Sequence, residues 1–328
     1  MVAVLVGIVV IYNLFFAKVS IDDTSYVCID RDDNGDSAID KLKSTGADFS
    51  EAGFAMLANI CKYNKNVHAG RYEVNREMST LQLFRCMKNH ISVPVKIVLP
   101  TTRTVSTLAG KLSQLLLADS VEIMDYFDND SVLDAIGYTR ETLPSLFIPN
   151  TYEVYWETTI EDFVNRMVRE HDAFWNDERK AQAEKIGMTP VEVATLASIV
   201  DSETANNGEK ARIAGLYMNR LQKGLPLQSD PTVIFAVGDF SIRRVLLQHL
   251  RIESPYNTYR VKGLPPGPIR IASIAGIDAV LNYEHNNYLY MCAKEDFSGT
   301  HNFASNIDEH YANARRYTQA LNARGITK

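Results

Sequence analysis

The stretch "TPVEVATLASIVDSETAN", residues 189–206, decides the fold of the C-terminal half because it predicts a helix whose register can be fixed. Thr189 and Glu192 have the spacing of a capping box, in which each side chain accepts a hydrogen bond from the other residue's backbone N–H. Pro190 suits the first turn, where its missing N–H costs nothing. The helix therefore begins at Thr189, and each later position can be assigned to a face.

An acid lies on the apolar face of this predicted helix. Leu196, Ile199, Val200 and Glu203 follow the i, i+3, i+4, i+7 spacing of one side. Asp201 lies roughly 200° around the helix from Glu203, so we expect it to be solvated or near the rim. The pattern treats the two acids differently and places Glu203 toward the packed side.

A buried carboxyl without a positive partner resists ionisation, which raises its pKa. A glutamic acid that titrates near neutral pH can donate a proton and take one back, as general acid–base catalysis requires. Glu203 is therefore the candidate catalytic residue. The alternative is structural: Glu203 forms an ion pair with Arg212 or Arg220 and holds two helices together.

Polar segments that could line a cleft follow this helix. "GLYMNRLQKGLPLQSDPTVIFAVG" predicts a helix that stops at Gly224, a polar run and a short helix ending before Gly238. "SPYNTYRVKGLPPGPI" predicts a stiff loop whose tyrosines suit sugar rings, or else an ordered loop packed only for stability. His301, in "GTHNF", is either another polar group of the cleft or a structural hydrogen-bonder. The candidate ligand-binding residues are Asn219, Arg220, Gln228, Ser229, Asp230, Tyr256, Asn257, Tyr259 and His301.

The N-terminal half reads as small α+β units. Strands are predicted at 26–29, 70–74 and from Val93, with helices ending at Gly46 and beginning at Ser50 and Ser79. Residues 120–146 are predicted to be helical, and one amphipathic helix is predicted from Thr159 to about Ala183. The pattern has no βαβ glycine fingerprint, and we expect the main domain change near Thr151.

The first 17 residues, "MVAVLVGIVVIYNLFFA", carry no charge. A helix of this length spans roughly 25 Å, slightly less than a hydrocarbon core of roughly 30 Å. We expect an uncleaved transmembrane signal-anchor whose short basic lead is missing from this chain, with the bulk of the chain outside the cytoplasmic membrane. The alternatives are a buried core helix and a cleaved signal.

Composition excludes some classes of function. A net charge of −6 in 328 residues argues against nucleic acid as a partner, because phosphate binding needs clustered Lys and Arg. The four cysteines stand far apart without metal-ligand spacing, so no metal site is expected. We interpret them as mostly buried side chains, although a disulfide among Cys28, Cys61 and Cys86 stays open.

These segments together resemble the endolytic murein transglycosylases of the YceG-like (MltG) family. The matching words are "LASIVDSET", "GLYMNRLQKGLPLQSDPTVIFAVG", "SPYNTYRVKGLPPGPI" and "GTHNF", in family order and spacing. The resemblance covers residues from Thr151 onward well and the N-terminal parts more loosely. It implies an α+β fold with a transmembrane anchor at 1–17, a LysM-like module at 18–100, a connecting α+β region at 101–150 and a catalytic domain at 151–328.

The resemblance also implies an activity. Glu203 would be the single catalytic residue of a lyase that cuts the MurNAc–GlcNAc bond of peptidoglycan strands internally and leaves a 1,6-anhydro ring. Such an enzyme would face the periplasm from the inner membrane, terminate nascent glycan strands and need no cofactor or metal. Its partners would be glycan strands, the lipid bilayer and peptidoglycan synthases. Asp201 departs from the glutamate that many relatives carry there.

Two other functions fit the same residues. A hydrolysing muramidase would use Glu203 with a second acid such as Asp230, since ordinary glycosidases need two carboxylates. A non-catalytic glycan-binding scaffold of the cell-wall machinery would keep the cleft without turnover.

Overall fold

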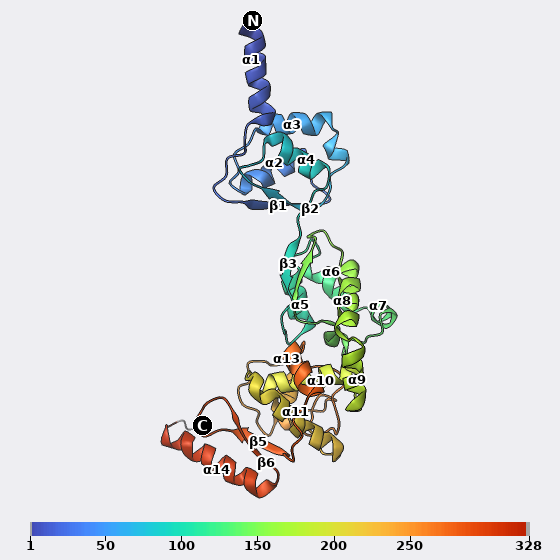
Figure 1. Cartoon of the computed structure of the whole chain (residues 1–328), viewed down its shortest axis with the longest axis vertical. Coiled ribbons are helices and arrows are strands. Elements are labelled where there is room, and N and C mark those ends of the chain that lie inside the picture. Colours follow the sequence, from blue (N-terminus) through green and yellow to red (C-terminus); the bar gives the residue numbers. More distant parts are fainter. Residues whose placement is uncertain (1, 326–328) are drawn as a thin grey trace. The chain divides into compact units, whose positions relative to one another are not determined.

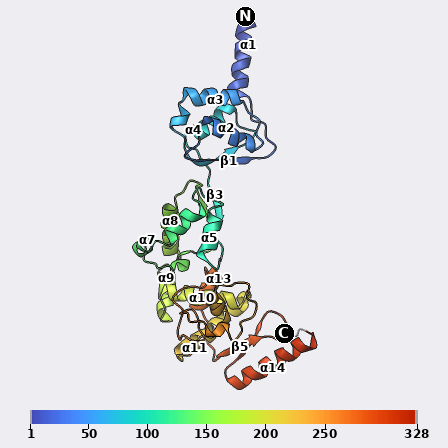
Figure 2. The same ribbon diagram turned by 180° about the vertical axis from the view of Figure 1, so that it is seen from behind.

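The computed structural model describes residues 2–325, so Met1 of the predicted anchor and residues 326–328 of the predicted catalytic domain lie outside it. The chain is a mixed α+β protein, mostly helical with small two-stranded sheets, which confirms the predicted class (Figures 1 and 2). Its packing forms two compact units. Unit 1 comprises residues up to Ile97, 110–123 and 151–163; unit 2 comprises 98–109, 124–150 and the residues from Val164. The boundaries predicted from the sequence stay predictions.

The N-terminal helix is shorter than the sequence predicts. Helix α1 covers Val2–Ile11, and a five-residue π-helix follows at Tyr12–Phe16. No residue of α1 is buried, and Leu5 and Ile8 are more than half exposed. Within residues 2–325, no helix combines the length and apolar composition that crossing a bilayer needs.

The predicted strands and helices of the first α+β module are confirmed. Strands β1 (Ser25–Ile29) and β2 (Gly70–Val74) pair antiparallel, with Val27 opposite Tyr72. Three helices complete the module: α2 (Gly35–Ser44), α3 (Glu51–Ile60) and α4 (Thr80–Lys88). The apolar sides of these elements form one core that includes Ile29, Leu42, Phe54, Tyr72 and Phe84.

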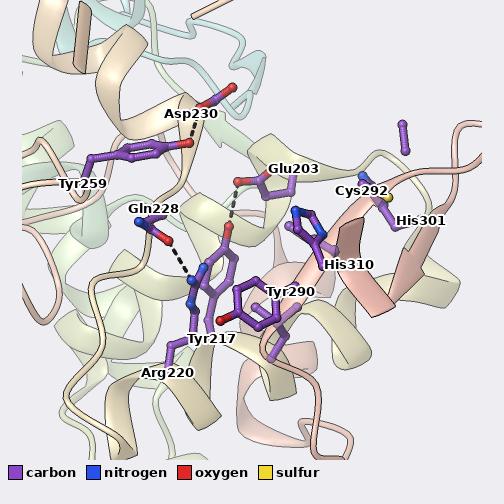
Figure 3. A pocket seen from close by; sticks show the side chains of 13 residues that line it. Glu203, Tyr217, Arg220, Gln228, Asp230, Tyr259, Tyr290, Cys292, His301 and His310 are labelled. Atoms are coloured by element: carbon purple, nitrogen blue, oxygen red, sulfur yellow. Dashed lines mark hydrogen bonds between the residues drawn. The ribbon is translucent and has the colours of Figure 1, made fainter. Parts of the chain in front are cut away.

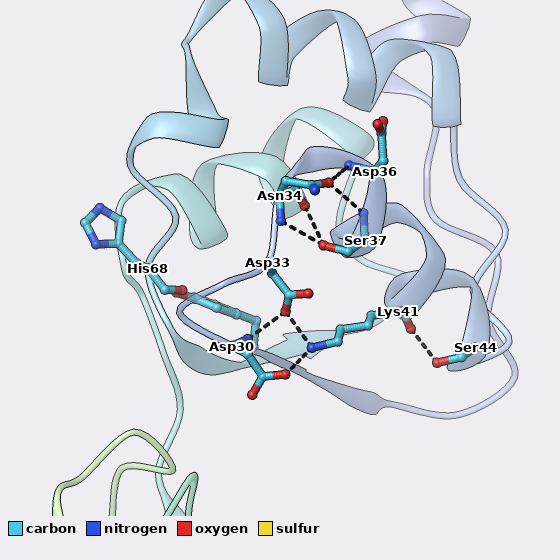
Figure 4. A network of polar contacts seen from close by, with 9 residues as sticks. Asp30, Asp33, Asn34, Asp36, Ser37, Lys41, Ser44 and His68 are labelled. Atoms are coloured by element: carbon cyan, nitrogen blue, oxygen red, sulfur yellow. Dashed lines mark hydrogen bonds and ion pairs between the residues drawn. The ribbon is translucent and has the colours of Figure 1, made fainter.

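The start of α2 is fixed by side chains (Figure 4). Asn34 accepts hydrogen bonds from the backbone N–H groups of Asp36 and Ser37, and so satisfies donors that a helix N-terminus leaves free. Lys41, one helical turn after Ser37, forms ion pairs with Asp33 at 2.5 Å and with Asp30. This network joins the end of β1 to α2.

The middle of the chain is helical over 120–146, as predicted. Its elements are β3 (Val95–Val98), α5 (Val105–Leu112), α6 (Ser120–Phe127), α7 (Asp130–Ala135), a 3₁₀ turn at Leu143–Leu146 and β4 (Thr151–Val154), which pairs with β3. The single helix predicted from Thr159 to about Ala183 is wrong. It is divided into α8 (Ile160–Phe174) and α9 (Asp177–Lys185), because Asn176 caps a new helix by accepting from the N–H of Arg179.

The rest of unit 2 surrounds α10 (Pro190–Glu203), whose capping box forms as predicted. Helices α11 (Asn207–Gln222) and α13 (Ile274–Leu281) pack against it. The remaining elements are α12 (Asp230–Val237), a 3₁₀ turn at His249–Arg251, the hairpin of β5 (Tyr290–Ala293) and β6 (His301–Ala304), and α14 (Ile307–Ala323), which packs on that hairpin. The core around α10 includes Leu196, Ile199, Val200, Ile213 and Tyr217.

Candidate active site

Glu203 is the last residue of α10 and lines a cavity of about 350 Å³ (Figure 3). The helix ends there because Thr204 is extended, with φ −144° and ψ 140°. The cavity is walled by α11, the polar run before α12, the loop that carries Tyr259 and the β5–β6 hairpin. Its lining residues are Glu203, Leu216, Tyr217, Arg220, Gln228, Asp230, Tyr259, Tyr290, Met291, Cys292, Ala293, His301 and His310.

Two hydroxyl groups hold the carboxyl of Glu203. Tyr217 donates a hydrogen bond to Oε1 at 2.7 Å, and Ser229 donates to the same oxygen at 2.5 Å. Both hydrogen bonds are made by Oε1, and within residues 2–325 the other oxygen, Oε2, takes part in no ion pair. The carboxyl therefore has one oxygen fixed by the protein and one oxygen available to a ligand.

The environment of Glu203 favours its neutral form. Burial raises the pKa of Glu203 above its ordinary value of 4.5, and the nearby charge of Asp230 acts in the same direction. Hydrogen bonds from Ser229 and Tyr217 and the proximity of His301 oppose this shift, because they favour the carboxylate. Burial also raises the pKa of Tyr217 well above 10, so its hydroxyl remains a donor.

The alternative ion pair between Glu203 and an arginine does not form in the described part of the chain. Arg212 pairs with Glu284 at 3.0 Å. Arg220 donates to the carbonyl oxygen of Leu227 at 3.0 Å and to Oε1 of Gln228 at 2.7 Å. Glu203 is therefore not neutralised by a guanidinium.

The expectation that Asp201 is solvated is wrong. Its side chain is 5% exposed and pairs with Lys210, itself 7% exposed, at 2.7 Å. It also accepts hydrogen bonds from the backbone N–H of Ser273 at 2.6 Å and from the Ser273 hydroxyl at 2.9 Å. Asp201 is buried because neighbouring elements cover α10 on all sides: every residue from 193 to 200 is buried, so this part of the helix has no solvent side.

Five predicted ligand-binding residues line the cavity with Glu203: Arg220, Gln228, Asp230, Tyr259 and His301. Asp230 accepts a hydrogen bond from the Tyr259 hydroxyl at 2.6 Å, so the polar run and the tyrosine loop meet beside Glu203. Ser229 is fully buried and contacts Glu203 rather than the open cavity.

Three other predicted residues have structural contacts away from the cavity lining. Asn219 donates to Asn286 and to the carbonyl oxygen of Tyr288. Asn257 is 0% exposed, and its amide donates to the carbonyl oxygens of Leu250 and Ile252. The ring of Tyr256 packs on Phe235 with 4.7 Å between centroids. These side chains therefore stabilise the loops around the cavity.

The sequence reasoning missed Tyr217, Tyr290 and His310. Tyr217 and Arg220 are three residues apart on α11 and so share a face, a spacing that could have found Tyr217. Strand β5 is only partly buried and brings Tyr290 to the cavity, where the ring of His310 stacks on it with 5.3 Å between centroids.

His301 is held by an acid from α11. Glu209 accepts from the backbone N–H of His301 at 2.9 Å, and its other oxygen lies 3.2 Å from Nδ1. Since a carboxylate can only accept, it favours the tautomer with the proton on Nδ1. Nε2 is then the ring nitrogen left to a ligand, on a residue that lines the cavity.

The fold and the site define a class of protein: a mixed α+β chain with a carboxyl biased toward its protonated form, Glu203, in a cavity lined by tyrosine and polar side chains. Over residues 2–325, no group of three or more His, Cys, Asp or Glu side chains has the arrangement of a metal site.

The comparisons with known proteins give the family of the chain. The model of the YceG-like family matches residues 27–316, so the chain belongs to the YceG-like family. An endolytic murein transglycosylase of Bacillus subtilis (strain 168) is 33% identical over 184 residues, which are 56% of this chain and 50% of that protein. An endolytic murein transglycosylase of Streptococcus pneumoniae serotype 2 is 26% identical over 298 residues, 81% of this chain and 53% of that protein.

A solved structure shows the same fold. The crystal structure of a YceG-like protein from Listeria monocytogenes matches with a TM-score of 0.60 and 25% identity, over 88% of this chain and 98% of that one. The chain spans about half the length of the curated relatives it matches.

Proposed function

We propose that this chain is a lytic transglycosylase that cleaves the glycan strands of peptidoglycan internally. The observation that carries the proposal is the environment of Glu203, a cavity-lining carboxyl whose pKa is raised by burial and which no arginine neutralises. The substrate class comes from the curated relatives, whose name is endolytic murein transglycosylase.

The proposed reaction needs one carboxyl. Protonated Glu203 donates from Oε2 to the oxygen that joins C1 of N-acetylmuramic acid to N-acetylglucosamine, and this C1–O bond breaks. The resulting carboxylate takes the proton of the C6 hydroxyl as O6 bonds to C1 and closes the 1,6-anhydro ring. Glu203 ends protonated, and no water is consumed. Tyr217 and Ser229 hold Oε1 and stabilise the carboxylate between the two proton transfers.

A hydrolysing muramidase is the second candidate. It is favoured by one observation, the presence of Asp230 as a further acid in the same cavity. Hydrolysis would require this carboxylate to activate water. However, Oδ1 of Asp230 already accepts the hydrogen bond from Tyr259, which gives it a role in shaping the wall.

Mass spectrometry of digested peptidoglycan distinguishes the two reactions. The lyase yields fragments that end in 1,6-anhydro-N-acetylmuramic acid, and Glu203→Gln abolishes them. Reducing ends without anhydro products would favour the muramidase. Binding of murein sacculi with no turnover by the unaltered chain would favour a non-catalytic scaffold.

We also propose that residues 1–17 anchor the chain to the inner membrane, with the rest in the periplasm, where it would shorten nascent strands beside peptidoglycan synthases. The support is the uncharged sequence and the exposed apolar side chains of α1. Membrane fractionation of the full chain and of a chain without these residues tests the anchor. A soluble full chain would contradict it.

A further inference from the structure

Arg220 is a buried cation in the cavity wall. It is 8% exposed, and no acidic side chain among the described residues forms an ion pair with it. Its guanidinium donates to the carbonyl oxygen of Leu227 and to Oε1 of Gln228, and Nε is buried without a partner. A buried charge is costly unless it is well compensated, and here the protein supplies these two hydrogen bonds and the ring of Tyr290, whose centroid lies 5.4 Å from Cζ of Arg220.

The residue that Arg220 holds has an unusual backbone. Gln228 has φ +53°, in the left-handed region that side chains other than glycine seldom adopt. Its N–H donates to the carbonyl oxygen of Thr258 at 3.0 Å, and the flanking Leu227 and Ser229 are both fully buried. Strained backbone of this kind persists only where its surroundings determine it, and it clusters at functional sites.

The contact with Arg220 fixes which end of the Gln228 amide faces the cavity. A guanidinium has donors only, so the atom 2.7 Å from its Nη2 must be the amide oxygen. The NH₂ group of Gln228 is then the end left for a ligand. The oxygen and the nitrogen of the side-chain amide are similar in size, so it is the hydrogen bond from Arg220 that determines which of them faces the guanidinium.

We propose that Gln228, with its polarity set by Arg220, is a specificity residue that donates a hydrogen bond to the carbonyl oxygen of a sugar's acetamido group. A neutral acceptor is favoured over an anionic group because the carboxylate of Asp230 lines the same cavity. The inference rests on the proposed function, since it takes the cavity to bind glycan. It adds that the cavity distinguishes N-acetylated sugars from sugars with a hydroxyl at C2.

The test measures binding without turnover. Full-length chain carrying Glu203→Gln is titrated by calorimetry with a tetramer of N-acetylglucosamine and with cellotetraose, which has a hydroxyl in place of each acetamido group. We expect the N-acetylated tetramer to bind at least about tenfold more tightly, because a ligand without an acetamido carbonyl covers the NH₂ group of Gln228 and leaves it without that acceptor. Equal affinity, or no binding of the N-acetylated tetramer, overturns the proposal.

Gln228→Glu isolates the donor. The carboxylate keeps an oxygen facing Arg220 but has no N–H, so the preference for the N-acetylated tetramer should fall about tenfold. Gln222→Glu, at the exposed end of α11 outside the cavity lining, is the matched control and should keep the preference. Unchanged preference in Gln228→Glu overturns the proposal, and circular dichroism confirms that the variant is folded.

The outcome is separable from that of the proposed function. If the unaltered chain makes anhydro products while Gln228→Glu keeps full sugar preference, the inference fails and the lyase stands. If no anhydro products form but the preference depends on Gln228, the lyase fails and the recognition of the acetamido group stands.

Discussion

At the scale of single residues, the site depends on how Glu203 is kept from ionising. Its position on the packed side of α10 follows from the sequence, because the capping box fixes the register and the i, i+7 spacing to Leu196 fixes the face. The hydroxyls of Tyr217 and Ser229 that hold it could not be predicted, since they come from other elements. The fate of Asp201 was predicted wrongly for the same reason, because a single helix does not reveal what covers its second side.

The raised pKa of Glu203 predicts that the site destabilises the fold at neutral pH. The folded state binds this proton more tightly than the unfolded state does. The contribution of Glu203 to the free energy of unfolding is therefore fully present below pH 4.5 and is lost as the pH rises through the raised pKa. Glu203→Gln stays neutral and keeps the hydroxyl contacts. We therefore expect its melting temperature to exceed that of the unaltered chain at pH 7.

At pH 4 the two proteins should melt together, and this is the control for the previous prediction. Calorimetry at both values gives the comparison. A lower melting temperature for Glu203→Gln at pH 7 would show that the charged carboxylate is stabilising in the fold.

Tyr217 should tune the pH dependence of activity. Its hydrogen bond favours the carboxylate, so Tyr217→Phe removes a factor that lowers the pKa of Glu203. The alkaline limb of kcat/KM, where the acid loses its proton, should move upward by about one pH unit, because a hydrogen bond to a charged group contributes about 1.5–3 kcal/mol. Tyr311→Phe, on the exposed face of α14, should leave the profile in place. A limb that stays fixed or moves downward in Tyr217→Phe refutes this assignment.

At the scale of elements, α10 is held by its neighbours α11 and α13. Asp201 joins Lys210 of α11 to Ser273, whose side chain caps α13 by accepting from the N–H of Gly276. Gly276 has to be small, because a Cβ there would lie 2.6 Å from Oδ1 of Asp201. The sequence predicts the start of α10 and the end of α11, but neither α13 nor this three-helix contact, which joins residues about 70 positions apart.

The Asp201–Lys210 pair should be a major determinant of stability. Asp201→Ala leaves the ammonium of Lys210 buried and uncompensated, and breaking a buried pair in this way costs about 3–5 kcal/mol. Asp278→Ala is the matched control: its contact with Arg179 is 3.4 Å long and its side chain is 46% exposed, so it should cost less than about 1 kcal/mol. Urea denaturation measures both, and equal losses would contradict the distinction.

At the scale of the whole molecule, the chain is divided into two compact units, each with a hydrophobic core of its own. The sequence predicts the strands and helices of the first module and the start of α10 because their caps and periodicity are local, but it does not predict α13. It does not predict how the middle segments are shared, since residues 98–109 and 124–150 belong to unit 2 while 110–123 and 151–163 belong to unit 1. Such interleaving is set by packing between distant segments, which one sequence does not record.

Two separate cores predict two unfolding transitions. Leu42→Ala removes a fully buried side chain from the core of unit 1, and Leu196→Ala does the same in unit 2. Each should destabilise its own unit by about 2–5 kcal/mol through lost packing and the cavity left behind. Differential scanning calorimetry should show each variant lowering one transition and leaving the other in place, so that each serves as the other's control. Only Leu196→Ala should reduce glycan cleavage as temperature rises, because Glu203 is on the same helix. A single transition lowered by both variants would mean that the units unfold as one cooperative body.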